Sequence, residues 1–110
     1  MTWVPSDKVL VNRNIYEPFD PAINEFVKRH GLHLFHEDRD WQIRYIMLEQ
    51  EWNPTACLVV TDPDENNHVS VVAVDHDRYL REEIDADVNT IGAALEKAWH
   101  IFQTAKKKTF

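Results

Sequence analysis

The chain has 110 residues, 44% of them hydrophobic and twelve aromatic, which is typical of one globular domain around one core. Its two glycines exclude the glycine-rich phosphate-binding loops of nucleotide enzymes, and no serine stands in a context that suggests a serine hydrolase. The net charge is −7, which disfavours contact with nucleic acid or anionic lipid and favours basic partners.

The first predicted helix begins at Asp20-Pro21. Aspartate can cap a helix with its side chain, and proline is well accepted at the first helical position. Apolar residues follow at helical spacing over 23–30, and Gly31 is expected to end the helix in the left-handed conformation. Before this helix only Val9–Val11 has the composition of a strand, and the rest of the N-terminal segment is expected to be irregular.

The middle of the chain predicts four β-strands. They cover residues 32–36, 41–48, 56–61 and 68–74. The alternation of side chains is clearest over 41–48, and the turn-forming residues 62–67 indicate a hairpin between the last two strands. Short connections of this kind favour an antiparallel meander, in which each strand pairs with the next along the chain.

The C-terminal part predicts a long amphipathic helix. Apolar residues recur at steps of three and four from Val88 onward, which indicates a helix of about eighteen residues. Residues 78–85 before it are interpreted as a short helix or a turn. The predicted fold is therefore α+β, a single domain over 1–110: a two-layer sandwich in which an N-terminal helix and a long C-terminal helix cover one face of a four-stranded antiparallel meander, in the order α-β-β-β-β-α.

The only cysteine, Cys57, cannot form an internal disulfide and lies in an apolar run at 57–60. A buried, reduced thiol is the expected state, which favours a reducing compartment. The N-terminus shows no signal-peptide pattern and no stretch is apolar enough to span a membrane, so a cytoplasmic location is expected.

One hypothesis for function is a small metal-dependent enzyme built on histidine and aspartate residues around the fourth strand. The candidates are His33, His36, His68, Asp75, His76 and Asp77, whose imidazole and carboxylate groups suit zinc or manganese. Two arguments disfavour a site. Histidines three apart on a strand point to opposite faces, and three consecutive residues rarely converge on one ion. We therefore expect no metal and no cofactor, and catalytic activity is not indicated.

The preferred hypothesis is a small acidic protein-binding module that docks on a basic protein surface. Residues 32–90 hold fourteen acidic and four basic side chains, and an aromatic residue ringed by charge resembles an interface hot spot. The candidate binding residues are Trp52, Glu49, Glu51, Asp62, Asp64 and Glu65. An inhibitor, an immunity-type antagonist, a chaperone or a nucleic-acid-mimicking decoy would all act in this way. The alternative is an ordinary solvated acidic surface with Trp52 in the core.

Two further kinds of partner follow from the pattern. The helix-sheet-helix order resembles double-stranded-RNA-binding domains in outline, but the lysines gather at Lys106–Lys108 and the centre is acidic, so nucleic-acid binding is not expected. An exposed sheet edge, at the first or the fourth predicted strand, could instead pair two copies into a homodimer.

Overall fold

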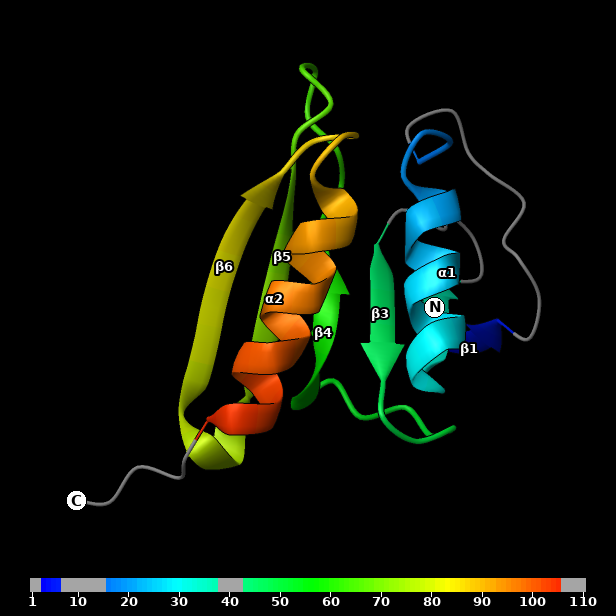
Figure 1. The fold of residues 1–110 in the computed structure, drawn as a ribbon. Coiled ribbons are helices and arrows are strands. Elements are labelled where there is room, and N and C mark those ends of the chain that lie inside the picture. Colours follow the sequence, from blue (N-terminus) through cyan, green and yellow to red (C-terminus); the bar gives the residue numbers. More distant parts are fainter. Residues whose placement is uncertain (1–2, 7–15, 38–42, 106–110) are drawn as a thin grey trace.

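A computed structural model of the chain describes residues 3–6, 16–37 and 43–105. Figure 1 shows two helices side by side over one face of a twisted sheet. The elements in chain order are β1 (Trp3–Ser6), α1 (Asp20–His30), β2 (His33–Glu37), β3 (Arg44–Met47), β4 (Ala56–Val60), β5 (Val69–Asp75), the 3-10 turn η1 (His76–Arg78), β6 (Leu80–Ala86) and α2 (Ile91–Thr104).

The sheet has six strands in the order β1-β2-β3-β4-β5-β6, and every neighbouring pair is antiparallel. The predicted α+β class, the meander and the helices on one face are confirmed. The four predicted strands correspond to β2, β3, β4 and β5, and the structure adds one strand at each edge. The strands expected to form the edges of the sheet therefore lie inside it.

The strand β1 was not predicted, because the N-terminal segment was expected to be irregular. Its backbone pairs with β2, with Pro5 opposite Phe35. Proline cannot donate to a ladder, so it occurs mainly at sheet edges, and β1 is an edge strand. The strand candidate at Val9–Val11 lies outside the described residues.

The strand β6 replaces the short helix or turn expected over residues 78–85. Leu80 and Ile84 are half-buried and pack against the core, whereas Arg81, Glu83 and Asp85 are exposed. This is a period of two that is interrupted at Glu82, which shares the phase of Leu80 and Ile84 but is exposed, so the sequence does not show it clearly. The turn into the strand is made by η1 and by a left-handed residue after it.

Both helices have the predicted apolar faces but different starts. Phe19, not Asp20, is the N-cap of α1, and no side chain caps that end. Gly31 ends the helix with φ 63° as predicted. The C-terminal helix has 14 residues and begins only after a turn closed by Asp87, whose carboxylate accepts hydrogen bonds from the Thr90 backbone N–H and hydroxyl. Val88 precedes the helix and is exposed.

The Asp20 carboxylate has another role, because it binds Arg44 inside the core. The Nε and Nη2 of Arg44 each donate to a different carboxylate oxygen, both at 3.1 Å. The guanidinium also lies 4.0 Å from the centre of the Tyr16 ring. Arg44 is 0% exposed and Asp20 is 3% exposed, so this ion pair ties the start of α1 to the centre of the sheet away from water.

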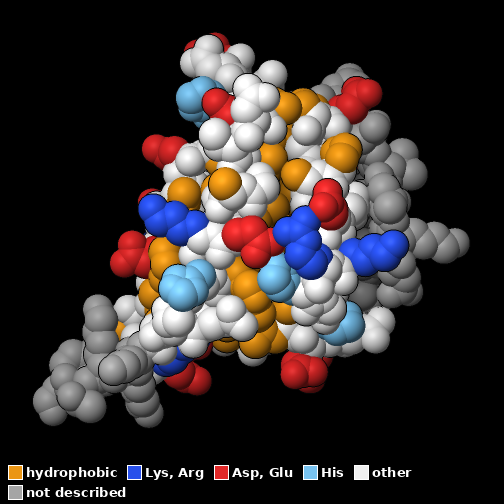
Figure 2. All heavy atoms as spheres, in the orientation of Figure 1, with side chains coloured by type: hydrophobic (Ala, Val, Ile, Leu, Met, Phe, Trp, Pro, Cys, Tyr) orange, Lys and Arg blue, Asp and Glu red, His pale blue; other side chains and the backbone are white. Residues whose placement is uncertain are grey.

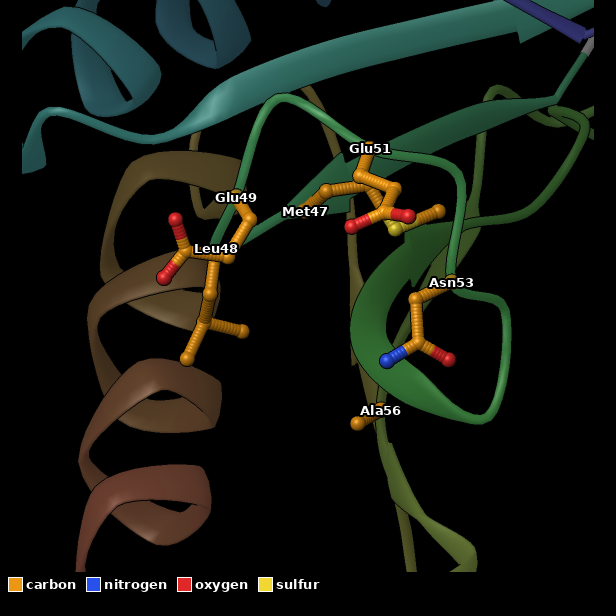
Figure 3. A pocket seen from close by; sticks show the side chains of 6 residues that line it. All are labelled: Met47, Leu48, Glu49, Glu51, Asn53 and Ala56. Atoms are coloured by element: carbon orange, nitrogen blue, oxygen red, sulfur yellow. The ribbon is translucent and has the colours of Figure 1, made fainter.

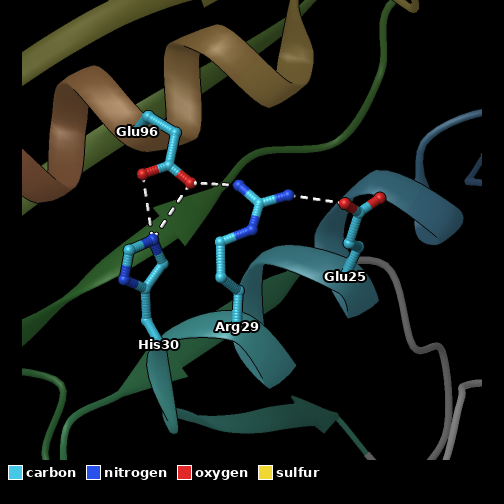
Figure 4. A network of polar contacts seen from close by, with 4 residues as sticks. All are labelled: Glu25, Arg29, His30 and Glu96. Atoms are coloured by element: carbon cyan, nitrogen blue, oxygen red, sulfur yellow. Dashed lines mark hydrogen bonds and ion pairs between the residues drawn. The ribbon is translucent and has the colours of Figure 1, made fainter.

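A second polar network joins the two helices near the surface (Figure 4). The Glu96 carboxylate of α2 contacts His30 Nε2 at 2.9 Å and accepts a hydrogen bond from Arg29 Nη1 at 2.7 Å. The His30 ring packs between Phe26 and Trp99, with ring centroids 4.8 and 5.8 Å away. The network therefore fixes α1 against α2 on the outer side of the core.

Candidate partner-binding surface

The connection between β3 and β4, residues Leu48–Thr55, carries three of the predicted binding residues and is called the Trp52 loop here. The Trp52 ring packs on the face of the sheet opposite the helices, 4.9 Å from the Tyr45 ring and 5.8 Å from the Phe35 ring. It belongs to a small cluster around the buried side chains of Phe35, Met47 and Cys57. Trp52 is thus half-buried and anchors the loop.

A hollow of about 200 Å³ lies beneath this loop (Figure 3). Leu48 lies on one side of it and Asn53 and Ala56 on the other. Its remaining lining comes from Met47, Glu49 and Glu51. The floor is therefore apolar, and among the described residues the charges in the lining are two carboxylates, both on exposed residues.

The loop is held in shape by its own hydrogen bonds. The Asn53 side-chain oxygen accepts the backbone N–H of Thr55 and the Thr55 hydroxyl, at 3.3 and 2.7 Å. The Sγ of Cys57 lies 3.6 Å from the carbonyl oxygen of Pro54. The carboxylates at the hollow are therefore presented from an ordered loop.

The other three predicted binding residues lie at the opposite end of β4. Asp62, Asp64 and Glu65 belong to the β4–β5 hairpin, and a strand of five residues spans about 17 Å. Asp62 accepts a hydrogen bond from the Tyr16 hydroxyl at 3.2 Å. Asp64 accepts the backbone N–H groups of Asn66 and His68. The six predicted residues therefore form two separate groups, not one ring around Trp52.

The hydrogen bonds in the hairpin change the pKa of the Asp64 carboxyl group. The backbone N–H groups of His68 and Asn66 stabilise the charged carboxylate and lower its pKa below the ordinary value. The side chain closes the turn, as aspartate commonly does. Two of the three hairpin acids thus have a structural use, and only Glu65 has none among these contacts.

The structure does not bring the metal-ligand candidates together. His33 lies on β2 and His76 follows β5, three strands away, which corresponds to about 14 Å. His68 precedes β5, at the opposite end of that strand from His76. Asp75 caps η1 and binds Arg78 at 2.6 Å, so its carboxylate is already engaged, and Asp77 lies exposed within η1.

Within residues 3–6, 16–37 and 43–105, no group of three His, Cys, Asp or Glu side chains is placed to hold a metal ion. The side chain of His36 lies outside what the structure describes. The geometry of the described residues therefore gives the metal-enzyme hypothesis no support.

The thiol of Cys57 is buried, as predicted. The residue is 0% exposed, and burial raises its pKa to about 12, because an apolar environment disfavours the thiolate. A thiol of this kind is a poor nucleophile at neutral pH. It lies under the Trp52 loop, where it can report on the packing of that loop.

Sequence reasoning missed the apolar part of the hollow. Leu48 was assigned to the predicted strand 41–48, and Asn53 lies in the interval before the predicted strand 56–61, to which no element was assigned. The available signal was a leucine followed by two acids in the eight-residue interval between β3 and β4, which is too long for a tight hairpin. It predicts a structured loop but not the hollow beneath it.

The sign of the exposed charges differs between the helix-bearing face and the hollow. Figure 2 shows acidic, basic and hydrophobic side chains interspersed on the helix-bearing face. The lining of the hollow holds Glu49 and Glu51 without a basic side chain. Further acidic side chains lie exposed at the hairpin and on the edge strand β6.

Comparison of the chain with protein-family models, curated proteins and solved structures gives no match. In the part of the chain that the structure describes, neither helix has the length and apolar character needed to cross a membrane.

Proposed function

We propose that this protein is a small binding module that docks on a basic protein surface through the Trp52 loop. The observation that carries the proposal is the hollow beneath the loop, with its apolar floor and its two carboxylates. A lysine or arginine side chain has the matching chemistry, since its aliphatic stem covers apolar surface while its charged end pairs with carboxylate.

The packing of Trp52 supports this role for the loop. An ordered loop loses less conformational entropy on binding than a disordered one. The contacts of Trp52 with Phe35 and Tyr45 supply that order. In this proposal Trp52 positions the two acids, and only its accessible part meets the partner.

In this proposal the acids of the β4–β5 hairpin contribute less to partner binding than Glu49 and Glu51. Asp62 and Asp64 are engaged in hydrogen bonds within the chain, and they lie at the far end of β4 from the hollow. They add to the long-range attraction of a basic partner, which increases the rate of association more than the affinity. An inhibitor, an antagonist of a basic toxin, a chaperone or a nucleic-acid mimic would each fit this description.

Carbodiimide crosslinking tests the proposal, because it joins carboxylates to lysines that are in contact. The full-length protein is mixed with native lysate and crosslinked, and mass spectrometry locates the joined residues. We expect crosslinks from Glu49 or Glu51 to lysines of one or a few basic proteins. The double variant Glu49→Gln, Glu51→Gln should abolish capture of those proteins, whereas the matched variant Glu65→Gln should retain it.

Two results would contradict this function. Equal loss of capture in the loop and hairpin variants would show non-specific attraction to net charge. Crosslinks confined to Glu65 and its neighbours would place the contact on the hairpin instead. The second hypothesis, metal-dependent catalysis, has no observation in its favour among the described residues.

A further inference from the structure

The strand β6 forms one edge of the sheet, and its seven residues pair only with β5 among the described residues. An edge strand presents backbone N–H and C=O groups that another chain can pair with. Which residues present those groups follows from the hydrogen bonds of the neighbouring strands.

The phase of the ladder is fixed by two backbone hydrogen bonds between β4, β5 and their flanking residues. Thr61 N donates to Ser70 O at 3.0 Å, and His76 N donates to Thr55 O at 2.8 Å. Residues 70, 72, 74 and 76 therefore direct their backbone groups toward β4. Because these groups alternate along a strand, residues 69, 71, 73 and 75 direct theirs toward β6.

The register then assigns the backbone groups of β6. Val71 lies opposite Ile84, and Ala73 lies opposite Glu82. Ile84 and Glu82 thus bond inward to β5, together with Leu80 and Ala86. The remaining three residues of the strand direct their N–H and C=O groups outward, and these are Arg81, Glu83 and Asp85.

The side chains of the same three residues lie on the sheet face that carries no helix. Glu83 pairs in register with Val72, and Ser70 Oγ lies 3.4 Å from the Asp85 carboxylate. All three residues are exposed. The one basic group is already in contact with an acid, since Arg81 Nη2 lies 3.3 Å from Glu83. Within the described residues, the edge of β6 therefore combines backbone groups that have no strand partner with an excess of carboxylate.

We propose that β6 accepts an extended basic segment of a partner protein as a seventh strand, antiparallel to β6, so that directly opposed residues exchange their backbone hydrogen bonds. Lysine or arginine side chains of that segment lie opposite Glu83 and Asp85, and its intervening residues face the helix side beside Ile84. Cross-strand pairs of opposite charge stabilise such pairing. A second copy of this chain is the less favoured occupant, because each copy carries a net charge of −7. The inference does not depend on the Trp52 loop.

The test uses the full-length protein and the synthetic peptide acetyl-Ser-Lys-Val-Lys-Val-Lys-Ser-amide, labelled for fluorescence anisotropy. Two isomeric control peptides carry two N-methyl groups each, one on the first two of its three lysines and the other on its two valines. In the proposed pairing the lysine N–H groups face β6 and the valine N–H groups face away. We expect N-methylation of the lysines to abolish binding, whereas N-methylation of the valines should leave most of it.

Protein variants then locate the site. The double variant Glu83→Lys, Asp85→Lys should weaken binding of the unmodified peptide by about tenfold or more, the sum of two reversed cross-strand pairs. The double variant Glu49→Lys, Glu51→Lys should leave this binding unchanged, which separates this inference from the function proposed for the Trp52 loop. Amide exchange of Arg81, Glu83 and Asp85 should slow when the peptide is bound.

Several outcomes would overturn the proposal. Equal binding of the two N-methylated peptides would show attraction by charge without strand pairing. If the Glu49→Lys, Glu51→Lys variant weakened peptide binding and the β6 variant did not, the peptide would bind at the Trp52 loop. Sedimentation of the free protein as a dimer that the β6 variant dissociates would show that a second copy occupies the edge.

Discussion

The two faces of the sheet are covered in different ways. On one face both helices pack over a large core that includes an entirely buried arginine. On the other face the buried cluster is small, formed by Phe35, Met47 and Cys57 with the half-buried Trp52 packed against it. The first face supplies most of the apolar burial that stabilises the fold. The second face leaves the Trp52 loop and the edge strand β6 accessible. We therefore assign the stability of the fold mainly to the helix-covered face, and binding to the Trp52 loop and β6.

The largest effect should come from the helix-covered face. Asp20→Ala leaves the buried Arg44 guanidinium without its carboxylate, which is expected to reduce the free energy of unfolding by about 3–5 kcal/mol. Urea denaturation of the two proteins measures this. The double variant Asp20→Leu, Arg44→Met is the control and should recover much of the loss, because no buried charge remains. A loss below about 1 kcal/mol for Asp20→Ala would show that water reaches Arg44.

A smaller effect is expected on the opposite face. Trp52→Ala removes a half-buried ring from the small cluster and should cost about 2 kcal/mol, less than a fully buried aromatic residue. The same change uncovers Cys57, so its reaction with a disulfide reagent at pH 8 should accelerate strongly. The Glu51→Gln variant keeps the ring and should leave both quantities unaltered. A slow thiol in Trp52→Ala would mean that the loop covers the cluster without Trp52.

The contact between the helices should contribute less again. Glu96 is partly desolvated, which raises its pKa, but the contacts with His30 and Arg29 outweigh this and lower it overall. Glu96→Gln is expected to cost about 0.5 kcal/mol, since the side chain is 41% exposed and solvent screens the pair. The pKa of the folded protein lies below that of the unfolded chain, so this stability is present above the unfolded value and is lost as the pH falls. Thermal melts of both proteins between pH 3 and pH 7 should therefore converge at the acid end.

The smallest effect is expected at the β4–β5 hairpin. Asp64→Ala removes the acceptor of two backbone N–H groups, so the variant should melt slightly earlier at neutral pH. Because the pKa of Asp64 is lowered in the folded protein, the difference should vanish as the pH falls through that pKa. Glu65→Ala is the matched control and should not change the melting temperature. If Glu65→Ala lowered the melting temperature as much as Asp64→Ala, the effect would come from loss of a negative charge and not from the hydrogen bonds of Asp64.

The comparison of the faces also explains which parts of the site were predictable. Glu49, Glu51 and Trp52 are close in sequence, so their grouping in one loop follows from the chain itself. Asp62 and Asp64 are near them in number but lie across β4 in space. The sequence places these acids in one acidic region, but β4 runs between the loop acids and the hairpin acids and so places the two groups at opposite ends of the strand.

The sequence by itself determined the class of the fold, four of the strands, both helices and the buried thiol. These depend on periodic apolar residues and on local turn chemistry, which act between near neighbours in the chain. Tertiary structure alone decided the rest. The edge strands β1 and β6 form because their backbones hydrogen-bond to the neighbouring strands β2 and β5. Asp20 binds Arg44 and does not cap its own helix, because the fold buries the two side chains together. Such choices depend on partners distant in sequence, and no local pattern records them.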